Sequence, residues 1–340
     1  MNANKLIYIL LIILCSSCMK DAKKEKHFNY QKNIINVREQ IKEIEIEDVF
    51  ISAASPLYVF EEYLIIVDLR ATKKMLHVFD KNNFDYITSI VDNGPGPAEV
   101  TSMGHVQYDK INRKFLVSDH GKQRIFSFDL DSAFADPHYI PIVKTRIKNS
   151  RFPDYYHYVN DTLSICRIVE LDPIGNNGGY QYSIGKWNMI TGEITPMKYT
   201  RPGIKTKRVT LSVSMEHGIY AEFYSNCDLI TICNLDGELV CNIYGRKWNS
   251  NTNTNRILYH YRGLLCNDKI VVAYSGENNF SAERRATKFI VLDINGNYLK
   301  TLETDYKIVE FCFDKDNNRI IMALDSEIQF AYLDLDGIIE

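Results

Sequence analysis

Three short apolar runs separated by polar turns stand out in the first third of the chain. They are Leu64–Val67, Met75–Phe79 and Tyr86–Ile90, and they are rich in the Val, Ile, Phe and Tyr typical of strands. With Tyr58–Phe60 in front, they predict a four-stranded antiparallel sheet. One such sheet cannot bury both of its faces, so the pattern predicts further copies of the same unit on either side.

The same pattern recurs along the rest of the chain and gives six units. After the N-terminal residues, no amphipathic helical pattern exceeds two turns. Six four-stranded sheets arranged radially form a six-bladed β-propeller, which is the all-β fold that we predict. The first and second strands of the units are predicted at Leu57–Phe60 and Leu64–Asp68, Val106–Tyr108 and Phe115–Asp119, Tyr156–Val159 and Leu163–Arg167, Leu211–Met215 and Ile219–Tyr224, Tyr259–Arg262 and Ile270–Tyr274, and Val309–Phe313 and Ile320–Leu324.

A turn follows the predicted third strand of each unit. Several of these turns contain Asp-Gly or Asn-Gly, which favours two-residue type I′ hairpins because both central positions need positive φ. The turns are Lys81–Asn83, Asp131-Ser132, Thr191-Gly192, Asp236-Gly237, Asn295-Gly296 and Asp336-Gly337.

The last unit lacks residues for its outer strand, because only Ile338–Glu340 follow the final turn. Residues Glu43–Glu47 alternate like a strand but precede the first unit. We therefore predict that this segment pairs beside Gln329–Asp334 and closes the ring, since an open edge would otherwise remain.

The N-terminus has the features of an export signal. Lys5 precedes the nine-residue apolar run Leu6–Leu14, which is too short to span a bilayer but typical of a signal peptide. Ser16-Ser17-Cys18 resembles a bacterial lipobox, although Cys15 stands where Leu is usual. That resemblance implies lipidation at Cys18.

We therefore expect a signal peptide over 1–17, a lipid-anchored flexible tether over 18–33 and the propeller over 34–340. Lys20-Asp21 behind the anchor resembles a signal for surface export. The expected location is the outer membrane, surface-exposed, or otherwise facing the periplasm.

The chain as a whole resembles the TolB-like or NHL-like six-bladed propeller lipoproteins of Gram-negative outer membranes. The resemblance is carried by the lipobox, the repeats over 41–340 and the segment Asp92–Val100. That segment is similar to the family loop Gly-x-Gly-Pro-Gly-Glu-Phe, with Pro97-Ala98 displacing the glutamate and Val100 replacing the aromatic residue. The resemblance implies the fold and the location but no established biochemistry.

Composition narrows the function further. Hydrophobic residues make up 45% and charged residues 24% of the chain, and the net charge is −3, so there is no overall attraction to nucleic acid. Without an RNP-like motif, we expect no nucleic-acid partner. The remaining cysteines mostly lie within apolar strand patterns, which favours thiols. They are Cys166, Cys227, Cys233, Cys241, Cys266 and Cys312; a bridge between Cys233 and Cys241 would require a three-residue loop.

Candidate binding residues come from two regions. By analogy with other propellers, ligands meet the face formed by blade-to-blade loops and second-to-third-strand loops. These loops carry an excess of basic residues, which is either an anion-binding face or scattered solvated charge. The basic residues that we select are Arg70, Lys73, Arg124, Arg284 and Arg285.

The innermost strands supply the second group, near the axial channel. Aromatic side chains with hydroxyl groups suit carbohydrate or peptide recognition. Strand alternation turns about half of the triplets Tyr156–Tyr158 and Tyr259–Tyr261 into the blade packing. The candidates are His105, Tyr156, His157, Tyr158, His260, Tyr261, Arg262 and Glu310.

Known catalytic motifs do not match. The chain has no Gly-x-Ser-x-Gly elbow, the prolines of Gly94-Pro-Gly-Pro remove amide donors that a phosphate loop needs, and no Cys/His spacing fits zinc. We predict no catalytic residue, metal or cofactor. The favoured hypothesis is a binding module for a glycan, peptide or envelope protein. One alternative is a metal-dependent hydrolase or lyase using Glu310 in the channel, and another is a structural subunit of an envelope complex.

Overall fold

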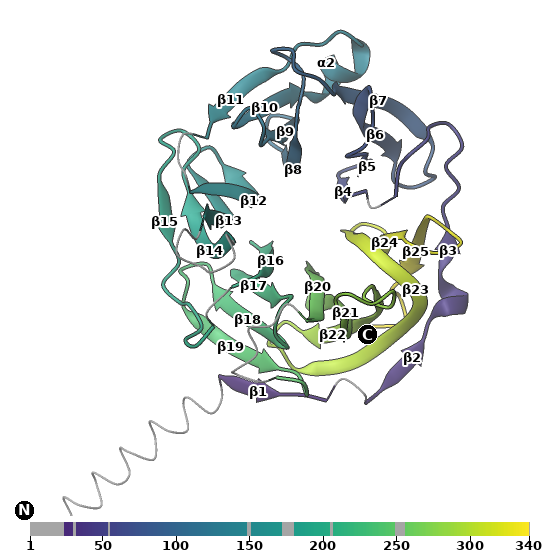
Figure 1. Cartoon of the computed structure of the whole chain (residues 1–340). Helices are drawn as coiled ribbons and strands as arrows, with labels where there is room; N and C mark the ends of the chain where they lie inside the picture. Colours follow the sequence, from purple (N-terminus) through teal and green to yellow (C-terminus); the bar gives the residue numbers. More distant parts are fainter. Residues whose placement is uncertain are drawn as a thin grey trace, which may run out of the picture.

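Blades of β-sheet radiate around a central axis and form a six-bladed β-propeller (Figure 1). The computed structural model describes residues 24–29, 32–53, 55–147, 151–171, 180–204, 207–248 and 256–339. The predicted signal peptide and Cys18 lie outside these residues. In each blade the first strand is nearest the axis and the fourth lies at the rim.

The first three blades are separate antiparallel sheets of four strands. Their order follows the sequence, as predicted. Blade one contains β4 (Leu57–Phe60), β5 (Tyr63–Val67), β6 (Lys74–Asp80) and β7 (Tyr86–Asp92); blade two contains β8 (Met103–Asp109), β9 (Lys114–Asp119), β10 (Arg124–Asp129) and β11 (Ile142–Arg146); blade three contains β12 (Phe152–Asn160), β13 (Leu163–Leu171), β14 (Tyr180–Trp187) and β15 (Ile194–Pro196).

Blades five and six share one long strand. β23 (Tyr298–Asp314) is the rim strand of blade five and then the innermost strand of blade six, with Asp305 at a φ of 58° between the two parts. Blade four contains β16 (Val209–Ser214), β17 (Ile219–Tyr224), β18 (Leu229–Asn234) and β19 (Leu239–Tyr244); blade five adds β20 (Ile257–Cys266), β21 (Lys269–Asn278) and β22 (Ala286–Asp293); blade six adds β24 (Arg319–Leu324) and β25 (Phe330–Asp334).

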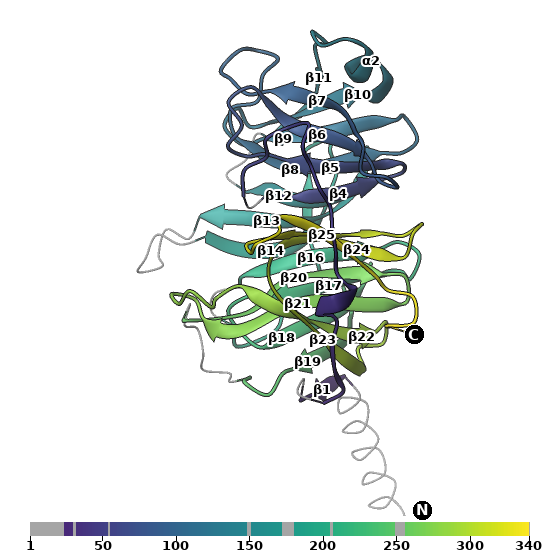
Figure 2. The ribbon, with the colours of Figure 1, turned by 90° about the vertical axis from the view of Figure 1, so that its right-hand side faces the viewer.

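The N-terminal residues run along the rim of blades four, five and six (Figure 2). β1 (Glu25–His27) pairs in parallel with β19, β2 (Ile34–Asn36) pairs in parallel with β23, and the 3-10 helix η1 (Arg38–Gln40) leads to β3 (Lys42–Glu43). We call β1, β2 and β3 together the N-terminal strap. The predicted flexible tether over 18–33 is therefore wrong for Glu25–His27, which gain backbone hydrogen bonds at the blade edge.

The predicted ring closure is confirmed. β3 pairs antiparallel with β25, with Glu43 opposite Ala331 and Lys42 opposite Tyr332. The Ile44 N–H continues the pairing by donating to the Phe330 carbonyl at 2.9 Å. Ile44 is also buried against Ile321, Ala323 and Leu57, so the closing segment contributes packing as well as hydrogen bonds.

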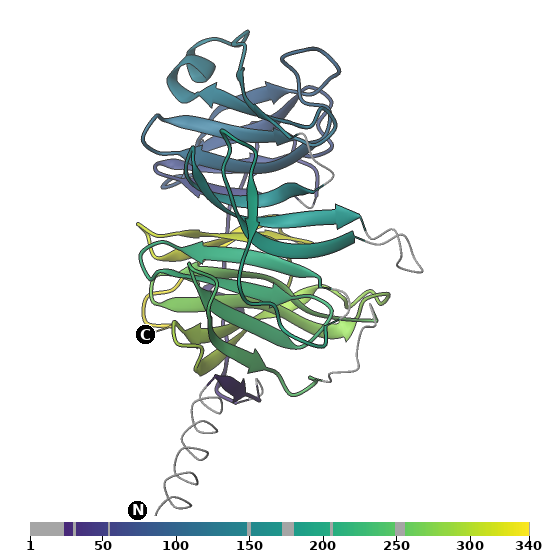
Figure 3. The ribbon, with the colours of Figure 1, turned by 90° about the vertical axis from the view of Figure 1, so that its left-hand side faces the viewer.

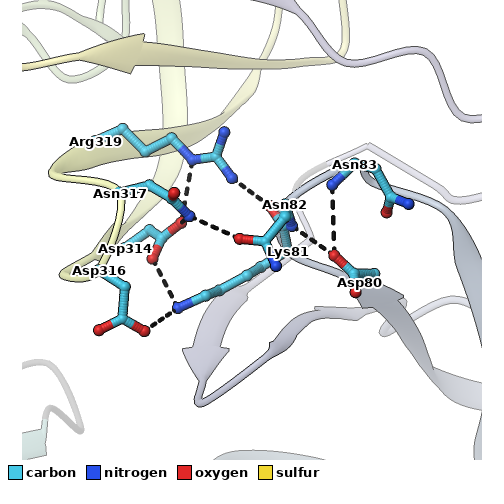
Figure 4. A network of polar contacts seen from close by, with 8 residues as sticks. All are labelled: Asp80, Lys81, Asn82, Asn83, Asp314, Asp316, Asn317 and Arg319. Atoms are coloured by element: carbon cyan, nitrogen blue, oxygen red, sulfur yellow. Dashed lines mark hydrogen bonds and ion pairs between the residues drawn. The ribbon is translucent and has the colours of Figure 1, made fainter.

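A polar cluster reinforces the contact between blades one and six (Figure 4). The buried Lys81 ammonium lies 3.0 Å from Asp314 and 2.5 Å from Asp316. Arg319 contacts Asp314 at 3.1 Å and donates to the Lys81 carbonyl. Asn317 donates to Asn82 across the same contact at 3.0 Å. We call Lys81, Asp314, Asp316, Asn317 and Arg319 the seam cluster.

The hydrophobic core is divided into clusters between neighbouring blades. Tyr156, Ile168 and Trp187 of blade three, for example, pack against Leu116 and Ile125 of blade two. Every blade therefore buries both faces against its neighbours, which is the reason that repeated units were expected.

The turns differ in detail from the prediction. Gly237 and Gly296 have φ near 80°, but Asp236 and Asn295 are not among the positive-φ residues. The Asn234 N–H donates to the Glu238 carbonyl, which encloses a three-residue loop with glycine in the left-handed region rather than a type I′ turn. The predicted turn at Asp131-Ser132 lies within the helix α2 (Leu130–Ala135), capped by the Asp129 carboxylate.

The predicted thiols at Cys166, Cys227, Cys233, Cys241, Cys266 and Cys312 are all buried and free. Cys241 lies opposite Ile232 in the hairpin, and Cys233 lies opposite Leu239, so the longer loop does not align the two sulfur atoms.

Candidate ligand-binding site

A cavity of about 430 Å³ lies where the innermost strands of all six blades converge. Its volume falls within the range of roughly 300–1,000 Å³ that is usual for small-molecule sites. We call it the axial pocket. It is lined by Pro56, Tyr58, Leu69, Met103, Gly104, His105, His120, Asp154, Tyr155, Arg167, Thr210, Leu211, Tyr261, Arg262 and Glu310.

One side of the axial pocket is formed by an ion pair within blade three. Arg167 donates from Nε and Nη2 to the two oxygens of Asp154 at 2.9 and 2.5 Å. Its Nη1 donates to the Val209 carbonyl of blade four at 2.7 Å. The Arg167 guanidinium also lies over the Tyr182 ring, 4.8 Å from its centre. These contacts hold the guanidinium in a fixed plane, because a bidentate pair restricts its rotation.

A second ion pair lies at blades five and six. Arg262 of β20 contacts Glu310 of β23, and both side chains are mostly buried, with 14% and 18% exposed. Such a pair is kept only because each charge has its partner, since removing one would leave the other desolvated. Glu310 is the axial carboxylate that the sequence analysis identified, and the structure shows it already paired.

Aromatic groups connect the two ion pairs. The Tyr58 hydroxyl and His105 Nδ1 are 3.1 Å apart, and the His105 and Tyr155 ring centres are 4.0 Å apart. Burial lowers the pKa of His105 well below its usual range, and the nearby Arg262 charge lowers it further. Burial also raises the pKa of Tyr58. Both groups are therefore uncharged near neutral pH.

His120 lies at the end of β9 and completes the wall beside Gly104. Burial lowers its pKa as well, against the opposing influence of Asp154. A Cβ on Gly104 would lie only 2.3 Å from His120 Nε2, so glycine is needed there for the close approach of the imidazole.

β-Bulges explain how adjacent residues of one strand both reach the axial pocket. The register shifts between Pro153 and Tyr155, and Asp154 and Tyr155 both line the cavity. A shift between His260 and Arg262 has the same result for Tyr261 and Arg262. Bulges re-aim side chains at sites of this kind.

The predicted channel residues separate into two groups. His105, Tyr261, Arg262 and Glu310 line the axial pocket. Tyr156 and His260 do not, because both are fully buried in blade packing, with Tyr156 against Trp187 and His260 bonded to the Tyr224 carbonyl.

The two remaining residues of the first triplet also differ from the prediction. The Tyr158 hydroxyl donates to Asp109 and Asp161, beside the turn that follows β12 and away from the pocket. His157 is half-buried and is not a pocket residue. The alternation from which we assigned both triplets is interrupted by the bulges, so β12 of blade three presents Asp154 and Tyr155 to the pocket instead of Tyr156.

Sequence reasoning also missed Tyr58, His120, Asp154, Tyr155 and Arg167. Arg167 had a usable signal, since its charge interrupts the apolar run from Ile165 to Val169. Asp154 and His120 had none, because aspartate and histidine are common next to turns.

The predicted basic residues are spread over three blades rather than gathered at the pocket. Arg70 and Lys73 line a separate cavity of about 790 Å³ beside Phe50. Arg124 lies over the Phe126 ring, Arg285 pairs with Asp325 at 3.5 Å, and Arg284 is exposed. A ligand role for this group stays a prediction.

The glycine- and proline-containing loop after β7 lies against the loop after β9. The Lys122 ammonium donates to the carbonyls of Gly94, Gly96 and Glu99 at 3.3, 2.5 and 2.7 Å. The Glu99 carboxylate accepts from the Gly96 N–H at 2.6 Å. A Cβ on Gly94 would meet Glu99 at 2.1 Å. This loop is therefore fixed by a lysine cap, and its glycines allow the glutamate to fold back.

Comparisons with known proteins agree with the fold. A family described as DUF5128, 6-bladed beta-propeller, matches residues 19–171, which span the strap, blades one and two, and half of blade three. No curated protein matches the chain. Among the described residues, no helix is long and apolar enough to cross a membrane, and no group of three or more His, Cys, Asp or Glu could hold a metal ion.

Several solved structures have a similar arrangement. One is a protein described as exported from Bacteroides fragilis, with 9% identity and a TM-score of 0.56 over 91% of this chain and 98% of that one. Another is a member of the duf4221 family from Bacteroides vulgatus, with 10% identity and a TM-score of 0.55 over 86% and 94%. A luciferin-regenerating enzyme has 9% identity and a TM-score of 0.54 over 86% and 94%. At these identities the likeness concerns architecture, and the chain is a six-bladed β-propeller.

Proposed function

We propose that this protein is a non-catalytic binding module that holds a ligand in the axial pocket. The observation that carries the proposal is the convergence of six blades on one cavity whose polar groups are already fixed by Arg167–Asp154 and Arg262–Glu310. Pre-organised polar groups favour binding, because little side-chain freedom is lost when the ligand arrives.

The paired carboxylates favour this role over the hydrolase alternative. A metal-dependent propeller enzyme needs axial carboxylates that are free to coordinate an ion. Asp154 and Glu310 each have an arginine partner in the pocket. Using either as a metal ligand would leave a mostly buried guanidinium unpaired, which is costly.

A binding assay with matched variants tests the proposal. Full-length protein would be screened by native mass spectrometry and thermal shift against mixed saccharides, short peptides and an outer-membrane extract. A ligand at about 100 times its Kd should add about 2.7 kcal/mol to the free energy of unfolding. Arg167→Met and Arg262→Met should lose this gain, whereas Lys315→Ala on an exposed turn should keep it. Equal gains in the pocket variants would refute the pocket as the binding site.

We also propose display on the outer membrane through a lipid at Cys18. The support is the apolar run Leu6–Leu14 followed by Ser16-Ser17-Cys18, and the adjacent Lys20-Asp21 favours the outer surface. Metabolic labelling with a fatty-acid analogue should mark the wild type and leave Cys18→Ala unmarked. Protease treatment of intact cells would then distinguish surface from periplasmic orientation.

A further inference from the structure

The two ion pairs of the axial pocket leave hydrogen-bonding capacity on both partners. Arg167 donates three hydrogen bonds, two to the Asp154 carboxylate and one to the Val209 carbonyl. A guanidinium carries five N–H donors, and each carboxylate oxygen has more than one lone-pair site. The Arg262–Glu310 pair, which is joined by a hydrogen bond from Arg262 Nη1, keeps donor and acceptor capacity in the same way. The pocket therefore presents a donor beside an acceptor at two places, on blade three and on blades five and six.

Neutral hydroxyl groups match this arrangement better than charged groups do. A hydroxyl can accept from the guanidinium and donate to the carboxylate without breaking the ion pair. A ligand anion would compete with Asp154 or Glu310 for its arginine, and a ligand cation would compete with the arginine for its carboxylate. Either competition exposes a mostly buried charge, which costs several kcal/mol.

The other pocket residues do not alter this balance of charge. Among the lining residues, Arg167 and Arg262 offset Asp154 and Glu310. His105 and His120 add no positive charge near neutral pH, since burial lowers the pKa of both. The basic residues Arg70, Lys73, Arg124, Arg284 and Arg285 do not line the cavity. The pocket thus has no net field that would attract an anion.

Apolar surface for a ring is also present. Tyr58, Tyr155 and Tyr261 line the cavity together with Leu69 and Met103. Aromatic faces stack on the C–H face of a sugar ring, while their hydroxyl groups remain available for hydrogen bonds. At about 30 Å³ per water, a volume of 430 Å³ holds about fourteen waters, which is room for about one or two pyranose rings.

From this geometry we infer that the axial pocket binds an uncharged saccharide, as one or two sugar rings of a neutral glycan, with vicinal hydroxyls bridging each arginine–carboxylate pair. This inference rests on the proposed binding function and specifies its ligand. The sugar hydroxyls are held by the two ion pairs, Arg167–Asp154 and Arg262–Glu310. The sugar ring stacks on Tyr155, whose own ring is supported by contact with His105.

The test uses full-length protein on an array that carries neutral glycans, acidic glycans and short peptides. We expect a neutral glycan to bind, with a Kd that changes less than about 2-fold between 0.05 and 0.5 M NaCl, since charge attraction is screened over this range. Soluble forms of the glycan should compete with the immobilised one.

Variants assign that binding to the pocket. Arg262→Gln and Tyr155→Ala should each weaken it by about 10-fold or more, as expected for losing one charge-assisted hydrogen bond or one stacking surface. The double variant Arg262→Gln with Glu310→Gln removes both charges without leaving one unpaired, and so separates loss of binding from loss of folding. Lys315→Ala, whose partner Glu216 is equally exposed, is the control and should bind like the wild type.

Each other outcome contradicts a defined part of the argument. Peptides or acidic glycans that bind with steep salt dependence, and that lose affinity in the pocket variants, would overturn the saccharide while keeping the binding module. Absence of binding to the whole array, or binding that the pocket variants do not change, would overturn both.

Discussion

The two halves of the ring protect their outer edges by different means. Blades four and five each carry a strap strand on their rim strand, namely β1 on β19 and β2 on β23, and in blade six the strap strand β3 is itself the outermost strand, beside β25. In the described part of blades one, two and three, the rim strands β7, β11 and β15 are outermost in their sheets. Figure 3 views the molecule from the side on which β11 and β15 lie. A bare rim strand presents unpaired N–H and C=O groups to other chains.

The uncovered half relies on local features instead. β15 has only three residues and ends at Pro196, which cannot donate to an added strand. α2 lies against β7 and β10, beside the rim of blades one and two. β11 carries Lys144 and Arg146, and charged residues discourage edge pairing. The comparison shows that one fold can protect its sheet edges in two ways. A segment distant in sequence can cover the edge, or residues of the edge strand itself can discourage pairing.

The halves meet where blade six contacts blade one, and the seam cluster lies at this contact. The largest effect is expected from Asp314→Ala. It leaves Lys81 and Arg319 buried without their shared partner, which should lower the free energy of unfolding by about 3–5 kcal/mol in urea titrations. Lys315→Ala, next in sequence but 63% exposed, should change it by less than about 1 kcal/mol. Similar values for both variants would show that the seam does not depend on this cluster.

The closing strand of the strap should matter nearly as much. Ile44→Pro removes the donor to the Phe330 carbonyl and the packing of a side chain that is 5% exposed. We expect a loss of about 3 kcal/mol in thermal or chemical unfolding. Ile140→Pro is the control in the uncovered half, because Ile140 is exposed and already precedes Pro141. If Ile44→Pro unfolds at the same temperature and denaturant concentration as the wild type, β3 does not stabilise the ring.

A pH effect is expected within the covered half. Burial raises the pKa of Asp228 to about 6, so its contribution to stability is present below its unfolded pKa near 3.8 and is lost as pH rises through 6. The facing His260 has a pKa lowered to about 4 by burial, so its contribution is lost in the opposite direction, as pH falls from 6.5 through 4. Both side chains are therefore neutral between these values.

The variant Asp228→Asn isolates the first of these terms. Relative to the wild type, its free energy of unfolding should rise by on the order of 2 kcal/mol between pH 4 and 7, because the amide has no charge to bury. The variant and the wild type also differ in stability by a constant amount at every pH, since Asp228 accepts a hydrogen bond from the Lys247 N–H at 3.0 Å that the amide replaces. A difference that stays constant over this range would mean that Asp228 does not titrate as described.

The smallest effect is expected at the first strap strand. Phe28→Pro removes the donor to the Tyr244 carbonyl beyond β1 and the packing of a partly buried ring, so the loss should be about 1–2 kcal/mol. The exposed β19 edge should instead become visible as faster amide exchange and concentration-dependent association in sedimentation. A loss as large as that of Ile44→Pro would show that β1 closes the ring rather than covering it.

The blades could be predicted because their alternation is regular and their neighbours bury both faces. The closing strand was predicted for the same reason, since Glu43–Glu47 alternates clearly. β1 carries no such signal: Glu25-Lys26-His27 is polar throughout and pairs through its backbone. A segment held by main-chain hydrogen bonds leaves little trace in the side-chain pattern.

The axial pocket was predictable only in part, because it is built where alternation fails. Tyr261 and Arg262 are neighbours in sequence and face the same cavity owing to a bulge, and Asp154 and Tyr155 do likewise. A period-two pattern assigns such pairs to opposite faces. Tyr156 was chosen and Tyr155 missed for this reason.

The strap also determines how the ring bears mechanical load. Its strands attach in series to blades four, five and six, beginning at Lys24, whose carbonyl accepts from the Asn242 N–H. Tension applied at that end acts first on β1 and then on β2. The closing strand β3 is the last of the three to bear the force. β1 and β2 can therefore detach first while the pairing of β3 with β25 still keeps the ring closed.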